Sequence, residues 1–569
     1  MEGTFSRLRE LDRAHYLAAL AFILFAIAAG IFEQKREWLL ADDQITTSAM
    51  VLKDLNSELF PNDPVLSSDR YKIYAPPVRI ILKIATNLSG GDVEQGSRLV
   101  IPLLLIVFLF FMYLLLNELT HNSLVSFVVS LAAASRRPTL PDSFFGIWGM
   151  QSVFARTFFL AFLPLVFWLF WRYRHDRRVV WSFLLLGVIS NFHPTGGYTM
   201  TPILLLTLLF CRGFNRDTII DLFIGGVLAV VGIFPFILDY LNYPRDYLVG
   251  NDILSAVTLY PVSPDRFTGK GYLLPIPSEL LIKALSVGAD VIFFTLLAFI
   301  IRWRQRSAED GFVVKIILSV LIVTVGGTAL LQLWGWFRGE TVWYSELMRG
   351  FRFIFIPLFI GVAFFLKSLF SIVTVLRLRW IYFAAFSVII LVYPMLPNFQ
   401  ILLSFHEELP LAESVEEAEE LEVLITAYFY RLGFNVLPRD VAVSFIASWT
   451  GIEPERVVEL LAERDMEKQD YDEIAFWALE NTAVDERIII NNPHFKIKAQ
   501  RELGEQIIPD AVPEPIKACF EEEDQVCLVN EARNQDARYI IVEQTFPEVA
   551  LPVVFKNSTY IVYEVVVET

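Results

Sequence analysis

Eleven apolar runs in the first 400 residues constrain this chain more than any other feature of its sequence. A helix of about 20 apolar residues crosses the roughly 30 Å hydrocarbon core of a bilayer, and most of the runs approach that length. None continues as a long alternating pattern, which excludes a membrane β-barrel. The sequence therefore predicts a polytopic membrane protein with about eleven transmembrane helices, near residues 15–33, 98–117, 122–135, 153–171, 179–192, 199–211, 218–240, 287–301, 312–334, 351–370 and 380–397.

Basic residues gather in four short segments between these runs. Counting crossings from a cytoplasmic N-terminus places all four segments on the cytoplasmic side, as the positive-inside bias requires. We therefore expect a multi-pass protein of the cytoplasmic (plasma) membrane, with a cytoplasmic N-terminus, an extracytoplasmic C-terminal region and a long first outer loop at residues 34–97. The four segments contain Arg172, Arg174, Arg177 and Arg178; Arg212 and Arg216; Arg302, Arg304 and Arg306; and Lys367, Arg377 and Arg379.

The charge balance divides the chain into two regions. Residues 1–399 hold 34 Lys and Arg against 28 Asp and Glu, a net of +6, whereas residues 400–569 hold 13 against 35, a net of −22. The two values add to the −16 of the whole chain. Regions with different solvents explain this division, so we predict a transmembrane domain at 1–398 and an acidic soluble domain at 399–569.

The acidic region has the pattern of a separate α/β domain. Helical patterns cover about 411–432, 438–448, 454–464 and 469–481, and strand-like segments follow at Arg487–Ile490, Arg538–Glu543, Pro552–Phe555 and Thr559–Val567. The segment Lys556–Ser558 is a short hairpin connection between the last two. No glycine-rich phosphate loop occurs, so nucleotide binding has no support, and no nucleic-acid partner is expected.

Two further features leave alternatives open. Cys519 and Cys527 are eight residues apart; they form a disulfide if the region faces an oxidising compartment, or they are two free thiols. In the first outer loop, Ile45–Leu59 and Pro77–Leu88 have apolar residues at helical spacing. They are either amphipathic helices at the membrane interface or ordinary surface helices of a small outer cap.

Two adjacent carboxylates, Asp42 and Asp43, follow the first apolar run. Three roles are open for them. They can cap the helix that follows, since Asp is a favoured N-cap residue. They can bind a divalent cation through hard oxygen ligands, although no cofactor is specified by the sequence. One of them can also act as a general base toward an acceptor hydroxyl or amine.

Cationic residues at the predicted outer ends of other runs can contact an anion. His193 precedes a proline and two glycines, where an imidazole and backbone N–H groups can meet an anion, or it belongs to a plain interhelical turn. Arg349 and Arg352 share a helix face. Their guanidinium groups suit phosphate because they bind it bidentately and stay charged, or they snorkel to lipid headgroups. Arg156 is a weaker case of the same kind.

The layout and several short motifs resemble the GT-C class of membrane glycosyltransferases, and more narrowly a poorly characterised prokaryotic group within it. The layout is an acidic pair after the first helix, a long first outer loop, many further helices and an outer C-terminal domain. The motifs are Arg156–Ala161, Phe192–Pro194, Glu346–Arg349, Phe476–Thr482, Arg487–Ile490 and Asp536–Val542.

The resemblance implies a function and a set of site residues. GT-C enzymes use polyprenyl-phosphate-linked sugars as donors, so this chain is expected to transfer a sugar to a lipid, glycan or protein acceptor on the outer face of the bilayer. It implies that Asp42 or Asp43 is the catalytic base and that Arg349 and Arg352 bind the lipid phosphate. Substrate contacts are also expected from Glu346, His193 and Arg156. A lipid or glycan transporter and a scaffold that displays the outer domain are the rival interpretations.

Overall fold

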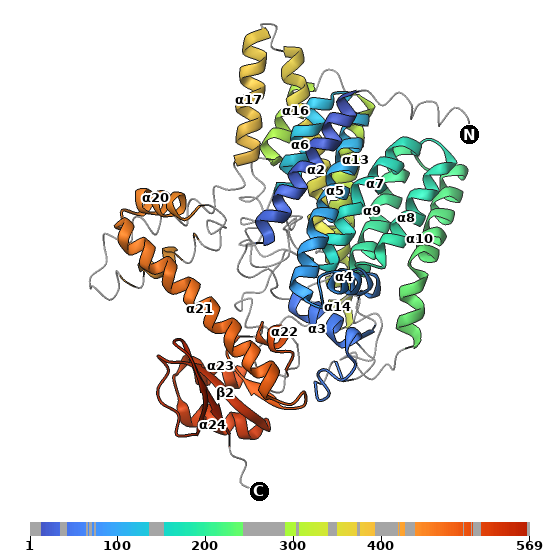
Figure 1. The fold of residues 1–569 in the computed structure, drawn as a ribbon. Coiled ribbons are helices and arrows are strands. Elements are labelled where there is room, and N and C mark those ends of the chain that lie inside the picture. The colour runs from blue at the N-terminus through green and yellow to red at the C-terminus, as the bar shows by residue number, and fades with distance from the viewer. Residues whose placement is uncertain are drawn as a thin grey trace. The chain divides into compact units, whose positions relative to one another are not determined.

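The chain forms two compact units in the computed structural model, shown as a ribbon in Figure 1. Residues 1–29 and 101–397 make the helical unit, and residues 30–100 and 398–569 make the sheet unit. The structure describes residues 13–34, 43–63, 66–67, 71–72, 75–135, 153–242, 291–302, 307–338, 347, 350–372, 376–392, 419, 421–426, 429, 438–492, 494–501, 503 and 514–565.

Helices occupy the described part of every predicted apolar run. Six of those described are long and apolar enough to cross a membrane, namely Val93–Thr120, Ala155–Tyr173, Pro194–Arg212, Arg216–Asn242, Ala308–Leu331 and Gly350–Leu369, and His15–Ile31, Ser123–Ala134 and Val291–Arg302 are shorter apolar helices. The elements are α2 (Arg13–Gln34), α5 (Val93–Thr120), α6 (Ser123–Ser135), α7 (Ala155–Tyr173), η2 (Arg177–Val179), α8 (Val180–Ser190), α9 (Pro194–Arg212), α10 (Arg216–Asn242), α13 (Ala308–Leu321), η5 (Ile322–Gly326), α14 (Gly327–Arg338), η6 (Gly350–Ile354), α16 (Phe355–Ile372) and α17 (Leu376–Val392).

Glycines allow α8 and α10 to pack backbone against backbone. A Cβ atom added to Gly187 of α8 would lie 2.2 Å from the carbonyl oxygen of Ala229, and one added to Gly232 of α10 would lie 2.6 Å from the carbonyl oxygen of Leu184. Small residues at helix interfaces in membranes permit this close approach, and with it more van der Waals contact. The sequence at these two positions therefore fixes the distance between the helices.

Asn191, at the end of α8, joins the same two helices by bonding to backbone groups of α10 where the hydrogen-bond ladder of that helix is interrupted. Its side-chain nitrogen donates to the carbonyl oxygen of Gly232 at 2.9 Å, and its side-chain oxygen accepts from the backbone N–H of Phe236 at 3.0 Å. In an uninterrupted helix these two backbone groups would bond to each other. Pro235 lies between them in α10, and proline commonly breaks this ladder. The amide of Asn191 therefore satisfies both groups.

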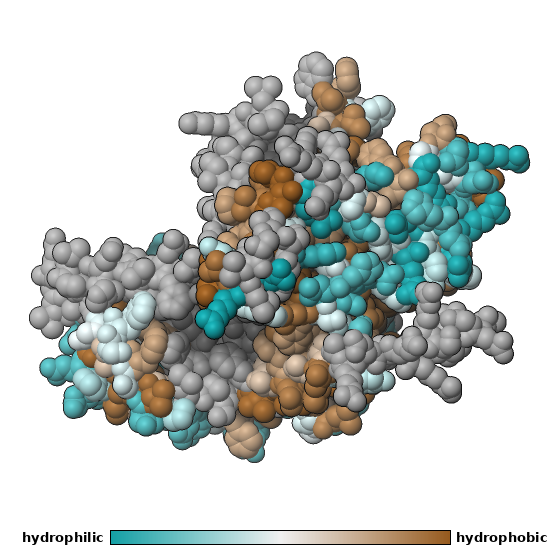
Figure 2. Space-filling model, turned by 90° about the horizontal axis from the view of Figure 1, so that it is seen from above, coloured by the Kyte–Doolittle hydropathy of each residue, from teal (hydrophilic) through white to brown (hydrophobic). Residues whose placement is uncertain are grey.

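The arginine-rich segments lie at one end of the helical unit. Arg212 contacts Asp221 at 2.5 Å, and Arg302 contacts Asp310 at 2.7 Å. The start of α2 is at this end too, because His15 is 3.3 Å from Asn117 near the end of α5, and the neighbouring Glu118 lies 3.8 Å from Arg172 at the end of α7. Figure 2 looks down on this end and shows hydrophilic residues gathered over α7–α10.

The sheet unit contains a four-stranded mixed sheet in the order β1-β2-β4-β3, with β1 parallel to β2 and the other pairs antiparallel. Helices cover both faces. Ile541 of β2 packs in the same core as residues of α21 and α22, and its neighbour Ile540 packs with α23 and α24. The elements are α3 (Asp43–Leu55), α4 (Pro76–Leu88), α20 (Arg439–Thr450), α21 (Pro454–Asn481), β1 (Arg487–Ile489), α22 (Phe495–Ala499), α23 (Glu514–Glu521), α24 (Gln525–Asn534), β2 (Ala537–Glu543), β3 (Val553–Lys556) and β4 (Tyr560–Glu564).

Most predictions for this region are confirmed. The four strands occur where we expected them, and Lys556–Ser558 lies at the connection between β3 and β4. The division into helices at 454–464 and 469–481 is wrong, since α21 runs through both without a glycine or proline to interrupt it. Most of the predicted helix at 411–432 lies outside the described residues. A disulfide joins Cys519 of α23 to Cys527 of α24, which is one of the two alternatives left open.

The first loop belongs to the sheet unit through polar contacts with α22 and its N-cap residue, His494. Asp63 contacts the ammonium of Lys496, and both side chains are buried. Glu94, at the start of α5, contacts Lys498 at 3.5 Å and His494 at 3.7 Å. Burial lowers the pKa of His494 to about 4, although Glu94 opposes the shift. The imidazole is therefore neutral at pH 7, and the two lysines supply the positive charge.

Exchanging glycine for alanine tests the α8–α10 contact. We expect Gly232→Ala to destabilise the protein by about 1–3 kcal/mol, because the new methyl group meets backbone atoms and the helices must separate. Gly226→Ala is a matched control on the same helix, since its Cβ would have no atom within 4 Å. The measurement is the thermal unfolding midpoint of each variant in detergent. Equal midpoints would show that the contact does not limit stability.

Candidate functional site

Three elements that carry predicted site residues meet around the ring of Phe159. This residue lies in the first turns of α7, its ring centroid is 6.2 Å from that of His193, and it is 5.8 Å from that of Phe353 in η6. The starts of α7 and α9 and the segment η6 before α16 therefore lie together. Helix N-termini present backbone N–H groups and a partial positive charge. The arrangement suits a negatively charged group.

Gly350 explains how η6 comes so close to α9. A Cβ atom at this position would lie 1.9 Å from the methyl carbon of Thr199, and 3.2 Å from that of Thr324 in η5. Any other residue would push η6 away from the start of α9. The segment η5 is a π-helix, a form that interrupts α-helices frequently at functional sites.

His193 caps α9. Its Nδ1 accepts a hydrogen bond from the backbone N–H of Gly196 at 2.9 Å, and the hydroxyl of Thr195 is 3.1 Å from its Nε2. Pro194 occupies the first helical position, where a missing N–H costs nothing. The bond to Nδ1 leaves the ring proton on Nε2 in the neutral imidazole. The His–Pro motif thus builds the turn, and it holds one face of the imidazole in a fixed place beside Phe159.

Two arginines belong to the elements that meet around Phe159. Arg352 belongs to η6, and its side chain is only 3% exposed. Arg156 is the second residue of α7, with its guanidinium carbon 4.1 Å from the centroid of the Phe154 ring. A guanidinium keeps its charge at all ordinary pH values, and burial of a charge is costly unless an anion or polar groups compensate for it. Arg352 therefore brings permanent positive charge into the interior of this end of the unit.

The structure brings together the elements of only some predicted site residues. Arg156, His193 and Arg352 belong to elements joined through Phe159 and Gly350. Asp42, Glu346 and Arg349 lie outside the described residues. Asp43 is the first residue of α3 in the sheet unit, and its side chain is not among those described. Among the described residues, no group of three His, Cys, Asp or Glu side chains is placed to hold a metal ion.

Sequence reasoning missed the residues that assemble the site. Phe159 and Phe353 look like ordinary members of apolar runs, and nothing in a single sequence distinguishes them from other core aromatics. Gly350 offered a signal, since it stands between two arginines at the start of a helix. A glycine at such a position commonly marks a close approach of the backbone.

Comparison with known proteins identifies the fold. No protein-family model matches the chain, and no curated protein sequence does either. Solved structures match it over nearly its whole length, and they place it in the GT-C fold class, as the sequence predicted.

One of these is the crystal structure of ArnT from Cupriavidus metallidurans bound to undecaprenyl phosphate, with a TM-score of 0.51 at 12% identity, covering 96% of this chain and 98% of that one. The same protein in the apo state gives 0.50 at 11% identity, covering 96% and 97%. The oligosaccharyltransferase of Archaeoglobus fulgidus in the apo form gives 0.43 at 13% identity, covering 92% and 69%.

Proposed function

We propose that this chain is a membrane glycosyltransferase that transfers a sugar from a polyprenyl-phosphate donor to a lipid, glycan or protein acceptor. The observation that carries the proposal is the GT-C fold, shared over 96% of this chain with a protein whose crystal structure holds undecaprenyl phosphate. The cationic site at the starts of α7, α9 and η6 supports it, since it has the charge that a lipid phosphate requires. A transporter or a scaffold would share the helices but has no need of a catalytic base.

The proposed reaction is a displacement at the anomeric carbon of the donor sugar. The acceptor oxygen or nitrogen forms a bond to that carbon while the bond from the carbon to the phosphate oxygen breaks. A carboxylate of Asp42 or Asp43 takes the acceptor proton, and the polyprenyl phosphate leaves with the bonding electrons. Guanidinium groups of Arg349 and Arg352 stabilise the negative charge that develops on the leaving phosphate. A divalent cation held by the same two carboxylates is an additional proposal.

The site is proposed to face the outside of the cytoplasmic membrane. Two features of the structure support this topology. The start of α2 lies at the same end of the helical unit as the arginine-rich segments, as the positive-inside bias requires if the N-terminus is cytoplasmic. The disulfide between Cys519 and Cys527 suits an oxidising compartment.

Reporter fusions test the topology. A reporter inserted after Arg178 is expected on the cytoplasmic side, and one fused to the C-terminus is expected outside. The physical reason is the odd number of crossings that we predict between the N-terminus and the C-terminal region. Finding both reporters on one side of the membrane would overturn the proposed orientation.

The two acidic residues are tested by Asp42→Asn and Asp43→Asn, which remove a charge while keeping size and hydrogen bonding. We expect one of the two variants to abolish sugar transfer by the purified enzyme from a defined polyprenyl-phosphate donor, because an amide cannot accept the acceptor proton. Asp536→Asn, on an exposed turn of the sheet unit, is the control. Full activity in both variants would leave helix capping as the role of the pair.

The two arginines are tested by the difference between lysine and alanine replacements. If Arg349 and Arg352 clamp a phosphate, Arg→Lys is expected to weaken binding of a polyprenyl phosphate nearly as much as Arg→Ala, since lysine lacks the planar fork. Losing such a contact costs on the order of 1.5–3 kcal/mol, or roughly ten- to a hundredfold in affinity. Arg216→Ala is the control. Arg216 is exposed at the start of α10, whereas the contact of that helix with Asn191 is near its other end, at Phe236. Lysine variants that bind like wild type would instead indicate snorkelling.

A further inference from the structure

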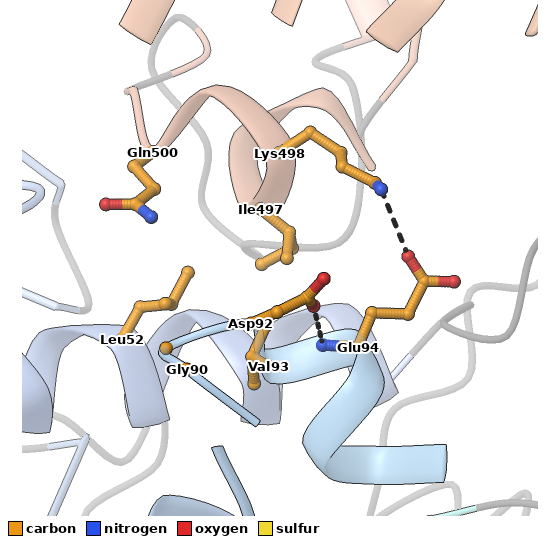
Figure 3. A pocket seen from close by; sticks show the side chains of 9 residues that line it. Leu52, Gly90, Asp92, Val93, Glu94, Ile497, Lys498 and Gln500 are labelled. Carbon is orange, nitrogen blue, oxygen red and sulfur yellow. Dashed lines mark hydrogen bonds and ion pairs between the residues drawn. The ribbon is translucent and has the colours of Figure 1, made fainter. Parts of the chain in front are cut away.

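A cavity of about 350 Å³ lies inside the sheet unit, between the first loop and α22. Its walls come from the end of α3, from the turn that leads into α5, and from the segment Ile497–Gln500 (Figure 3). The volume is at the lower end of the range of small-molecule sites. None of its described lining residues is among those predicted from the sequence to act in catalysis. The cavity belongs to the sheet unit, whereas Phe159 belongs to the helical unit.

The apolar part of the cavity lining, called its floor here, comes from three side chains. Leu52, Val93 and Ile497 line it, and each is largely buried in the packing beneath. Gly90 and Gly91 have positive φ values of 72° and 97°, and a Cβ atom on either would meet no atom within 4 Å. The two glycines thus allow the left-handed backbone conformation of this turn, and the space beside them at the edge of the cavity is free.

Polar groups of three kinds lie around this floor. Asp92 caps α5 through Oδ1, which accepts from the backbone N–H of Glu94 at 2.8 Å and of Gln95 at 3.0 Å, and Figure 3 shows its other oxygen on the side of α22. The ammonium of Lys498 lies 3.5 Å from both Glu94 and Asp472. The side-chain amide of Gln500 completes the rim.

The charges around the cavity disfavour an anion. Three carboxylates, those of Asp92, Glu94 and Asp472, lie near two cations. The cations are Arg98, which contacts Glu94 at 2.7 Å, and Lys498, which contacts Glu94 and Asp472. Burial by itself would lower the pKa of Lys498, but the neighbouring carboxylates outweigh it and raise that pKa. The ammonium is thus already engaged by acidic groups. A phosphate would meet an excess of negative charge here.

We propose that this cavity binds a neutral sugar unit. Hydroxyl groups of a sugar both donate and accept, so they can bond to the carboxylate of Asp92 and to the amide of Gln500, while the C–H face of the ring packs on Leu52 and Ile497. No ionic partner is required. The site would hold part of a glycan, and its existence does not depend on the proposed transferase activity.

Binding to the full-length protein in detergent tests the site, with neutral methyl hexosides and the corresponding sugar 1-phosphates as probes, measured by titration calorimetry or saturation-transfer NMR. The methyl glycosides represent a sugar unit of a glycan, and the 1-phosphates represent the phosphate-linked sugar of a lipid donor. We expect at least one methyl glycoside to bind and its 1-phosphate to bind more weakly. Tighter binding of the 1-phosphate that the cavity variants described below weaken, or no binding of any neutral glycoside, would overturn the proposal.

Two variants connect such binding to this cavity. Asp92→Asn keeps the helix cap and removes the charge, and Gln500→Asn shortens the side chain at a position with φ of 52°, which asparagine tolerates. We expect roughly tenfold and fivefold weaker binding, respectively. Asp536→Asn and Gln95→Asn are the matched controls, since neither residue lines the cavity. Glycoside binding that is unchanged in both cavity variants would place the sugar elsewhere, whether or not the protein proves to transfer sugars.

Discussion

Water is absent from the hydrocarbon core, so each backbone N–H and C=O group there must find its partner within the protein. This requirement makes the helical unit helical, and it also decides how irregularities are repaired. Prolines lie inside α5, α7, α9 and α10. In α10 the repair is visible, because Asn191 supplies both a donor and an acceptor to the interrupted ladder. That asparagine is two residues from His193, so the repair also fixes the end of α8 beside the candidate site.

The candidate site depends on the same requirement that backbone polar groups find hydrogen-bond partners within the protein. The His193 side chain accepts a hydrogen bond from the N–H of Gly196 in the first turn of α9, and Gly350 lets η6 approach that helix start. The positive end of a helix dipole, a neutral imidazole and a buried guanidinium then lie in one region. Each of these elements has a local reason in the sequence. Their combination gathers positive charge where a negatively charged group would compensate for it.

Local pattern predicted the helices well and the assembly poorly. Apolar runs depend only on neighbouring residues, so all eleven coincide with helices, and the strands of the acidic region were found for the same reason. The long helix α21 was divided because its middle turns are polar on every side. The grouping of the first loop with the C-terminal region depends on Asp63 and Lys496, which are 433 residues apart, and a single sequence contains no record of such a pair. Likewise, the motif around His193 indicated a turn, but only the structure shows which neighbours that turn contacts.

The sheet unit is assembled from two parts of the chain that are made at very different times. Residues 43–100 leave the ribosome early, and the strands and α22 follow only after residues 101–486, which contain nearly all of the membrane helices. Asp63 and Glu94 must therefore wait for their lysine partners until synthesis is almost complete. During that interval the first loop is an unfinished half of a domain, whose carboxylates remain in water. The sheet unit is thus completed only after α22 has been synthesised. A chain that stops before α22 leaves the first loop without the residues that complete its fold.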